Sequence, residues 1–204
     1  MGFYERQVLP RVIDKVMGTK GFAKLRARAA RALSGEILEV GFGSGLNVPH
    51  YPPAVTKVYA VDPSEVGRRL AETRVADATV PIEFVGLDGE HLPLEDASVD
   101  EVFTTWTLCT IPHVELALAE MIRVLRPGGR FHFLEHGHSP DPKVARWQAR
   151  LDPIQQRIGG GCHLTRPIDA LVEDAGFEIE HLANFYIAGP KSMSYSYAGR
   201  AVRP

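Results

Sequence analysis

The segment that decides the fold is Ile37-Leu38-Glu39-Val40-Gly41-Phe42-Gly43-Ser44-Gly45-Leu46-Asn47. A short apolar run leads directly into three glycines at alternate positions, and a short helix is expected to follow near 46–51. Glycines suit such a loop because the backbone must turn sharply and let a ligand approach where a Cβ would clash. In parallel α/β sheets, this first loop lies at the carboxyl ends of the strands, where nucleotides bind. The segment therefore predicts the first strand and the ligand-binding loop of such a sheet.

The next hundred residues alternate short apolar runs with longer helical patterns. Strands are predicted near 36–40, 57–61, 82–85, 100–105 and 129–135, with helices near 64–74 and 114–125. The sequence Arg126-Pro127-Gly128-Gly129 is a Pro-Gly stop between the last of these helices and the strand that follows it. This alternation is typical of a parallel sheet with helices on both faces.

The two ends of the chain show different patterns. The first 33 residues are mainly helical, with breaks at Pro10 and at Gly18 and Gly21. After Pro140, helices are predicted near 142–157 and 167–175, and strands near 177–186 and 193–202, an ending that fits an antiparallel pair at the sheet edge. We therefore predict an α/β fold: a Rossmann-like, doubly wound, mostly parallel sheet with an antiparallel edge strand and a helical N-terminal segment. A single domain, 1–204, is expected, comprising the N-terminal segment 1–33, a cofactor-binding core 36–136 and a substrate-side part 137–204.

Composition narrows the class of protein. Of the residues, 45% are hydrophobic and 24% charged, and the net charge of -2 argues against a general nucleic-acid binder. Two cysteines cannot form a disulfide framework and are expected to be free thiols in a reducing compartment. Neither a signal peptide nor a bilayer-spanning run is evident, so a cytoplasmic protein is expected. The helices of 1–33 could pack, cover a site or contact a membrane surface, and the sequence does not indicate the oligomeric state.

The glycine spacing bears on which nucleotide binds. The dinucleotide fingerprint G-x-G-x-x-G would require a glycine where this chain has Leu46. In addition, Glu39 ends the strand, and a carboxylate is unfavourable beside a pyrophosphate. S-adenosylmethionine carries an amine and a sulfonium, which acidic surroundings suit. The loop therefore favours this methyl donor over NAD.

Asp62 ends the second strand, 21 residues beyond Gly41. A ribose-binding acid is expected at this place in such folds, and a carboxylate can accept from both ribose hydroxyls. The alternative is a helix N-cap, because Asp62 precedes Pro63, Ser64 and Glu65. Ser64 could take the capping role instead.

Residues 36 to about 136 together resemble a class I methyltransferase. The run Leu87-Asp88-Gly89-Glu90-His91-Leu92-Pro93-Leu94 is similar to the third-strand loop of ubiquinone-biosynthesis-type methyltransferases. The resemblance implies that Asp88, with the backbone around Gly89 and Glu90, holds the adenine amino group. The predicted cofactor-binding residues are Glu39, Gly41, Gly43, Gly45, Asn47, Asp62, Pro63, Asp88, Gly89, Glu90 and Thr105.

The acceptor is expected at the carboxyl ends of the fourth and fifth strands. His136 is a candidate general base, since histidine titrates near neutral pH, or else a histidine that supports a loop. Glu135 could orient this imidazole or bind the acceptor. Packing or acceptor contact suits Cys109 better than covalent catalysis, because free cysteine is usually buried. The other histidines considered form no metal-ligand pattern with the cysteines, so no metal is predicted; these are His113, His132, His138 and His163.

A narrower resemblance covers the later half of the chain. Five short segments follow the order found in animal methyltransferase-like proteins that methylate alkyl thiols. They are Leu108-Cys109, Glu135-His136, Trp147-Gln148, the run 158–162 and Leu164-Thr165-Arg166. These relatives carry a hydrophobic N-terminal anchor, which the first 33 residues do not resemble. The resemblance implies that the methyl acceptor is a small molecule that carries a thiol. The alternatives are a quinone-like ring carbon, a phospholipid amine, and a regulatory protein that binds S-adenosylmethionine without turnover.

Overall fold

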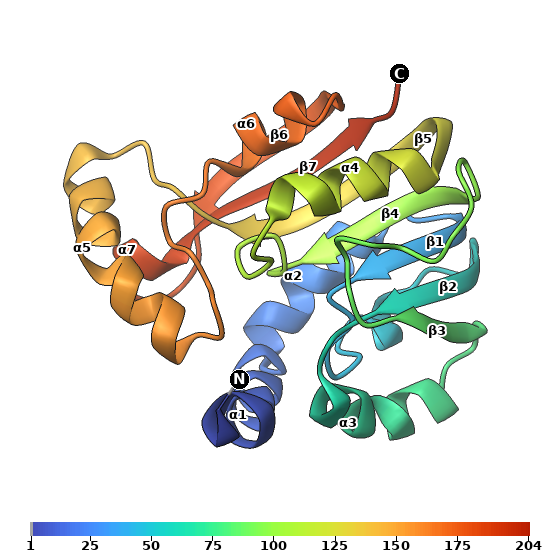
Figure 1. Cartoon of the computed structure of the whole chain (residues 1–204), viewed down its shortest axis with the longest axis horizontal. Helices are drawn as coiled ribbons and strands as arrows, with labels where there is room; N and C mark the ends of the chain where they lie inside the picture. Colours follow the sequence, from blue (N-terminus) through green and yellow to red (C-terminus); the bar gives the residue numbers. More distant parts are fainter. Residues whose placement is uncertain (1) are drawn as a thin grey trace.

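A computed structural model describes residues 2–204, whose strands form one seven-stranded sheet in the order β3-β2-β1-β4-β5-β7-β6 (Figure 1). The strands are β1 (Gly35–Val40), β2 (Val55–Val61), β3 (Ile82–Gly86), β4 (Val99–Thr105), β5 (Leu125–His136), β6 (Glu178–Tyr186) and β7 (Tyr195–Val202). β1 to β5 are parallel, whereas β7 pairs antiparallel with both β5 and β6. The predicted Rossmann-like sheet, with its antiparallel pair at one edge, is confirmed.

The helices lie mainly where the hydrophobic periodicity predicts them. The longer ones are α1 (Leu9–Met17), α2 (Lys20–Ala30), α3 (Glu65–Ala76), α4 (Val114–Val124), α5 (Pro142–Ile158) and α6 (Ile168–Asp174). A π-helical turn, η1 (Tyr4–Val8), precedes α1, and α7 (Lys191–Ser194) joins β6 to β7. No helix within residues 2–204 has both the length and the apolar character needed to cross a bilayer.

Two predicted elements differ most from the structure. The prediction of a helix at 46–51 is wrong, because only the 3₁₀ turn η2 (Val48–His50) forms there. Pro49 has no backbone N–H to donate, and Pro52-Pro53 prevents the helix from continuing. β5 begins at Leu125, before the predicted 129, because the Pro-Gly stop pairs with the chain end. The N–H of Gly128 donates to the Arg203 carbonyl at 2.9 Å, and Arg203 N–H donates back to Gly129 at 3.0 Å.

Helices cover both faces of the sheet. In Figure 1, α4 and α6 lie across the near face and α2 behind it. The buried side of α4, which includes Leu118 and Met121, packs with Phe131 of β5 in the larger apolar cluster. On the opposite face, Ala30 and Leu33 pack in a second cluster with Ile37, Val58 and Phe103. Burial on both faces aligns the carboxyl ends of β1, β4 and β5, where the predicted site lies.

Candidate active site

The glycine loop after β1 has three left-handed residues with different surroundings. Gly41, Gly43 and Gly45 have φ values of 81°, 55° and 74°. A Cβ on Gly41 would lie 1.9 Å from Oγ1 of Thr107, so this glycine lets the β1 and β4 loops touch. A Cβ on Gly43 would meet nothing nearer than Oδ2 of Asp62 at 3.9 Å. The loop thus leaves an open cradle at Gly43, which fits a ligand that approaches the backbone.

Asp62 binds the backbone on both sides of this cradle. Its Oδ2 accepts from the N–H of Gly43 at 2.7 Å, and its Oδ1 accepts from Ser64 at 2.8 Å. Burial raises the pKa of the carboxyl. Ser64, and not Asp62, caps α3, because its hydroxyl accepts from Gly67 N–H at 2.9 Å. Contact with ribose hydroxyls stays a prediction for Asp62, whose carboxylate oxygens each have a further lone pair.

Glu39 lies beneath the loop with 0% of its surface exposed. Its Oε1 accepts from Nδ2 of Asn47 at 2.9 Å, and its Oε2 accepts from the Tyr51 hydroxyl. Burial raises the pKa of Glu39 to about 7, against the lowering effect of these hydrogen bonds. The carboxyl thus fixes Asn47 and Tyr51 under the site.

Arg26 of α2 completes this buried network. Its Nη1 donates to Oδ1 of Asn47 at 2.9 Å and to Oγ1 of Thr105 at 2.6 Å. The guanidinium lies 4.8 Å from the ring centroid of Trp106, and burial lowers its pKa to about 10. The sequence analysis assigned Arg26 no role in the site. The available signal was its place beside apolar Leu25 and Ala29 of the same helix.

The predicted adenine-binding residues follow β3. Asp88 is exposed, and its Oδ1 accepts from Glu90 N–H at 2.8 Å. This hydrogen bond is the main cause of its lowered pKa. A Cβ on Gly89 would lie 2.9 Å from Cγ1 of Val40, so the loop packs directly against the end of β1. The structure therefore brings this loop to the glycine cradle, and its adenine contact stays a prediction.

Glu135 lies at the end of β5 with 0% exposure. Its Oε2 accepts from the N–H groups of Thr107 at 2.8 Å and Leu108 at 3.1 Å. Its Oε1 has no hydrogen-bond partner among residues 2–204, and burial raises its pKa to about 7. The hydrogen bonds of this carboxyl hold the loop after β4, which carries Cys109.

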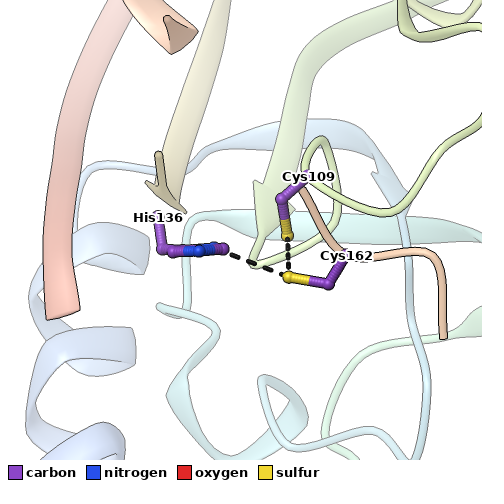
Figure 2. A group of neighbouring side chains, drawn as sticks. All are labelled: Cys109, His136 and Cys162. Carbon is purple, nitrogen blue, oxygen red and sulfur yellow. Dashed lines mark hydrogen bonds between the residues drawn. The ribbon is translucent and has the colours of Figure 1, made fainter. Parts of the chain in front are cut away.

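Cys109, His136 and Cys162 form one compact group at this edge (Figure 2). The sulfurs of Cys109 and Cys162 lie 3.5 Å apart, and Sγ of Cys162 lies 3.8 Å from Nδ1 of His136. Both cysteines are free thiols. Hydrogen bonding to Cys109 and His136 lowers the pKa of Cys162, whereas the same sulfur contact and burial raise that of Cys109.

Cys162 reaches the group through the glycine run after α5. Gly160 and Gly161 have φ values of 64° and 85°, and the next residues return to the β4 loop. There the N–H of His163 donates to the Cys109 carbonyl at 2.8 Å. Sequence reasoning quoted Cys162 within a motif but did not bring it to His136. No spacing rule could do so, because the two lie on separate segments joined by α5.

Gln148 fixes the segment that follows His136. Its Oε1 accepts from Ser139 N–H at 2.8 Å, and its Nε2 donates to the Gly137 carbonyl at 2.9 Å. Arg166 acts on the other side, where Nη1 donates to the Leu108 carbonyl. Two motifs quoted from the sequence therefore support the loops that carry the Cys109, His136 and Cys162 group.

Comparisons with known proteins agree with this geometry. A family described as "Methyltransferase domain" matches residues 38–133. Thiol S-methyltransferase TMT1A of Homo sapiens is 34% identical over 168 residues, which cover 79% of this chain and 68% of that protein. The chain belongs to the class I S-adenosylmethionine-dependent methyltransferases. Its predicted resemblance to this family and its thiol-methylating relatives is thereby confirmed.

Two further comparisons concern a second relative and a solved structure. Thiol S-methyltransferase TMT1B of Rattus norvegicus is 38% identical over 145 residues, covering 69% of this chain and 59% of that protein. The chain thus spans about three fifths to two thirds of the length of these relatives. The crystal structure of an S-adenosylmethionine-dependent methyltransferase from Methanosarcina mazei superposes with a TM-score of 0.63 at 23% identity, covering 82% and 92% of the two chains. This likeness supports the Rossmann-like fold described above.

Proposed function

We propose that this protein transfers the methyl group of S-adenosylmethionine to the sulfur of a small-molecule thiol. The observation that carries the proposal is the contact of Gly41 with Thr107. Thr107 lies two residues before Cys109, whose side chain belongs to the same buried group as His136, so a donor held at the glycine loop would lie near this group. The similarity to thiol S-methyltransferases supports a thiol as the acceptor.

The donor, when bound, supplies a methyl group already activated by a sulfonium. The chain therefore has mainly to align the acceptor and exclude water. We expect the N-terminal helices to help exclude water from the site, and their contacts with other elements support this role. Arg74 of α3 binds both Asp14 of α1, at 2.9 Å, and the carbonyl of Ser44 in the glycine loop, at 2.7 Å. Tyr4 also donates to the Ile158 carbonyl at 3.0 Å, which ties η1 to α5.

On the acceptor side, His136 and Cys162 are the polar side chains that an incoming sulfur would meet. His136 is only 7% exposed, while Cys162 is partly open. A thiol with a pKa around 8.5 needs modest help to ionise, whereas an alcohol needs far more. This difference supports a thiol over a hydroxyl acceptor at this site.

Turnover of methyl-labelled S-adenosylmethionine on a panel of alkyl thiols, quinols and phospholipid amines tests the proposal. Thiols should carry at least about ten times more label than the other acceptors. Preferential labelling of a quinol or a lipid amine would replace the thiol by one of those acceptors. Binding of S-adenosylhomocysteine without turnover of any acceptor would instead support a regulatory protein.

We further propose that α1 rests on an anionic membrane surface. Val12, Ile13 and Val16 of α1, and Val8 at the end of η1, are each at least 39% exposed, and Arg11 and Lys15 also lie on α1. An amphipathic helix of this kind binds headgroup regions by apolar burial and by attraction to anionic lipids. Co-sedimentation with vesicles of mixed phosphatidylserine and phosphatidylcholine should therefore exceed that with phosphatidylcholine alone, and Val12→Asp should abolish it. Equal recovery with both vesicle types would remove the anionic surface from the proposal.

A further inference from the structure

The group formed by Cys109, His136 and Cys162 lies among the segments after β4, β5 and α5, and only Cys109 and His136 were assigned a role from the sequence, on the acceptor side. Its three potential ligand atoms, two thiol sulfurs and one imidazole nitrogen, all lie within 4.8 Å of one another. They come from three separate segments: the β4 loop, the end of β5 and the glycine run after α5. In Figure 2 the side chains of Cys109 and His136 both point toward the sulfur of Cys162.

The spacing of these atoms matches a tetrahedral metal ion. Bonds of about 2.3 Å to sulfur and 2.0–2.1 Å to nitrogen, at tetrahedral angles, separate the ligand atoms by roughly 3.5–3.8 Å. The structure has 3.5 Å between the two sulfurs and 3.8 Å between Cys162 and His136. Small side-chain movements would therefore suffice to bind the ion.

The chemistry of the three side chains indicates which metal they would bind. Two thiolates with an imidazole favour zinc over the hard cations magnesium and calcium, which prefer oxygen. Three protein ligands leave one position free, the arrangement of catalytic zinc sites and not of closed structural ones. Cys162 is the most exposed of the three residues, so we expect an incoming molecule to approach the free position from its side.

We infer that Cys109, His136 and Cys162 bind a zinc ion whose open fourth position takes the acceptor thiol as a thiolate. The inference rests on the proposed thiol methylation and names how the acceptor is held. The acceptor replaces a zinc-bound water and releases its proton to solvent, forming a zinc–sulfur bond. A sulfur lone pair then attacks the donor methyl group, and the electrons of the broken carbon–sulfonium bond remain on the donor sulfur. The product thioether is neutral and a weaker ligand, so it leaves the metal.

This assignment changes the expected role of His136. As a ligand, the imidazole holds the ion, and the proton of the acceptor is lost because zinc stabilises the thiolate. The hydrogen bonds of Gln148 to Gly137 and Ser139 keep the segment after His136 in place. The hydrogen bonds of Glu135 do the same for the loop that carries Cys109.

The test measures zinc binding and turnover separately on the full chain. Chelator-treated protein should bind one zinc ion per chain by calorimetry, and cobalt in its place should give the intense visible bands of a tetrahedral thiolate site. Cys109→Ser, Cys162→Ser and His136→Ala should each weaken zinc binding at least about a hundredfold. The matched control is His181→Ala, an exposed histidine on β6, which should bind zinc as the unaltered chain does. Calorimetry with S-adenosylhomocysteine shows that each variant is folded.

The outcomes separate the metal from the reaction. Thiol methylation that falls at least about tenfold on zinc removal and returns on reloading supports the inference. Undetectable zinc binding, with thiol methylation intact in chelator-treated protein, overturns the inference and leaves the proposed function standing. One-to-one zinc binding without methylation of any thiol overturns the proposed function and the acceptor role of the ion, while the metal site itself stands.

Discussion

At the scale of single residues, Asp62 and Ser64 divide two tasks that the sequence analysis considered for Asp62. Asp62 accepts from the N–H of Gly43, whereas Ser64 caps α3. Asp62→Ala should remove charge-assisted hydrogen bonds worth roughly 1.5–3 kcal/mol each, and should therefore weaken S-adenosylhomocysteine binding at least about tenfold. Calorimetry measures this constant.

The matched variant is Ser64→Ala, which removes the cap. It should cost about 1 kcal/mol of unfolding free energy and leave donor binding within about twofold. Equal dissociation constants for Asp62→Ala and the unaltered chain would show that Asp62 only shapes the loop.

Glu39 gives the second prediction at this scale. Burial raises the pKa of this carboxyl from its ordinary value of 4.5 to about 7 in the folded chain. The folded state therefore keeps a proton that the unfolded state releases, and this residue lowers stability as pH rises from about 4.5 to about 7. Glu39→Gln removes the charge, so the stability of the variant relative to the unaltered chain should rise by up to roughly 3 kcal/mol across that window.

Urea unfolding of both proteins at pH 5, 6, 7 and 8 measures this difference. Glu72→Gln, at an exposed position of α3, reports the general effect of losing one carboxylate. A Glu39→Gln difference that stays constant with pH, like that of the control, would contradict the buried-carboxyl explanation.

At the scale of elements, the β1 and β4 loops are joined where Gly41 meets Thr107. Gly41→Ala would combine a left-handed φ of 81° with a Cβ 1.9 Å from Thr107 Oγ1. A loss of about 2–5 kcal/mol in unfolding free energy is expected, from backbone strain and overpacking together. Gly128→Ala isolates the backbone share, about 1–2 kcal/mol, because its φ is 75° with no atom within 4 Å of the new Cβ. Equal losses for the two variants in urea unfolding would exclude the steric contact.

The elements also show what local sequence can predict. The strands and the helices α3 to α6 follow from periodicity and turn residues, which act within a few positions of the chain. The helix at 46–51 failed because the glycine loop is followed by prolines at 49, 52 and 53. Arg26 and Cys162 were missed for another reason: their partners lie far away in sequence, and only the packing of α2 and of the glycine run brings them to the site.

At the scale of the whole molecule, the site joins elements from the N-terminal segment to β5. Arg26 links α2 to Thr105 at the end of β4, and Arg74 links α3 to α1. A ligand that binds these joined elements binds the folded chain alone, so it must raise global stability. S-adenosylhomocysteine at 100 times its dissociation constant should add about 2.7 kcal/mol. For a chain of 204 residues this corresponds to a rise in Tm of about 5–10 °C.

NAD at the same concentration is the matched comparison, and it should shift Tm by less than about 1 °C. The reason lies in the loop after β1, which has Leu46 where a dinucleotide site has glycine, and a buried carboxyl at Glu39. Asp62→Ala should reduce the shift with S-adenosylhomocysteine, since a tenfold weaker ligand at unchanged concentration stabilises by about 1.4 kcal/mol instead of 2.7. Scanning calorimetry of both proteins with each ligand measures these shifts. A larger Tm rise with NAD than with S-adenosylhomocysteine would contradict the assignment of the glycine loop to the methyl donor.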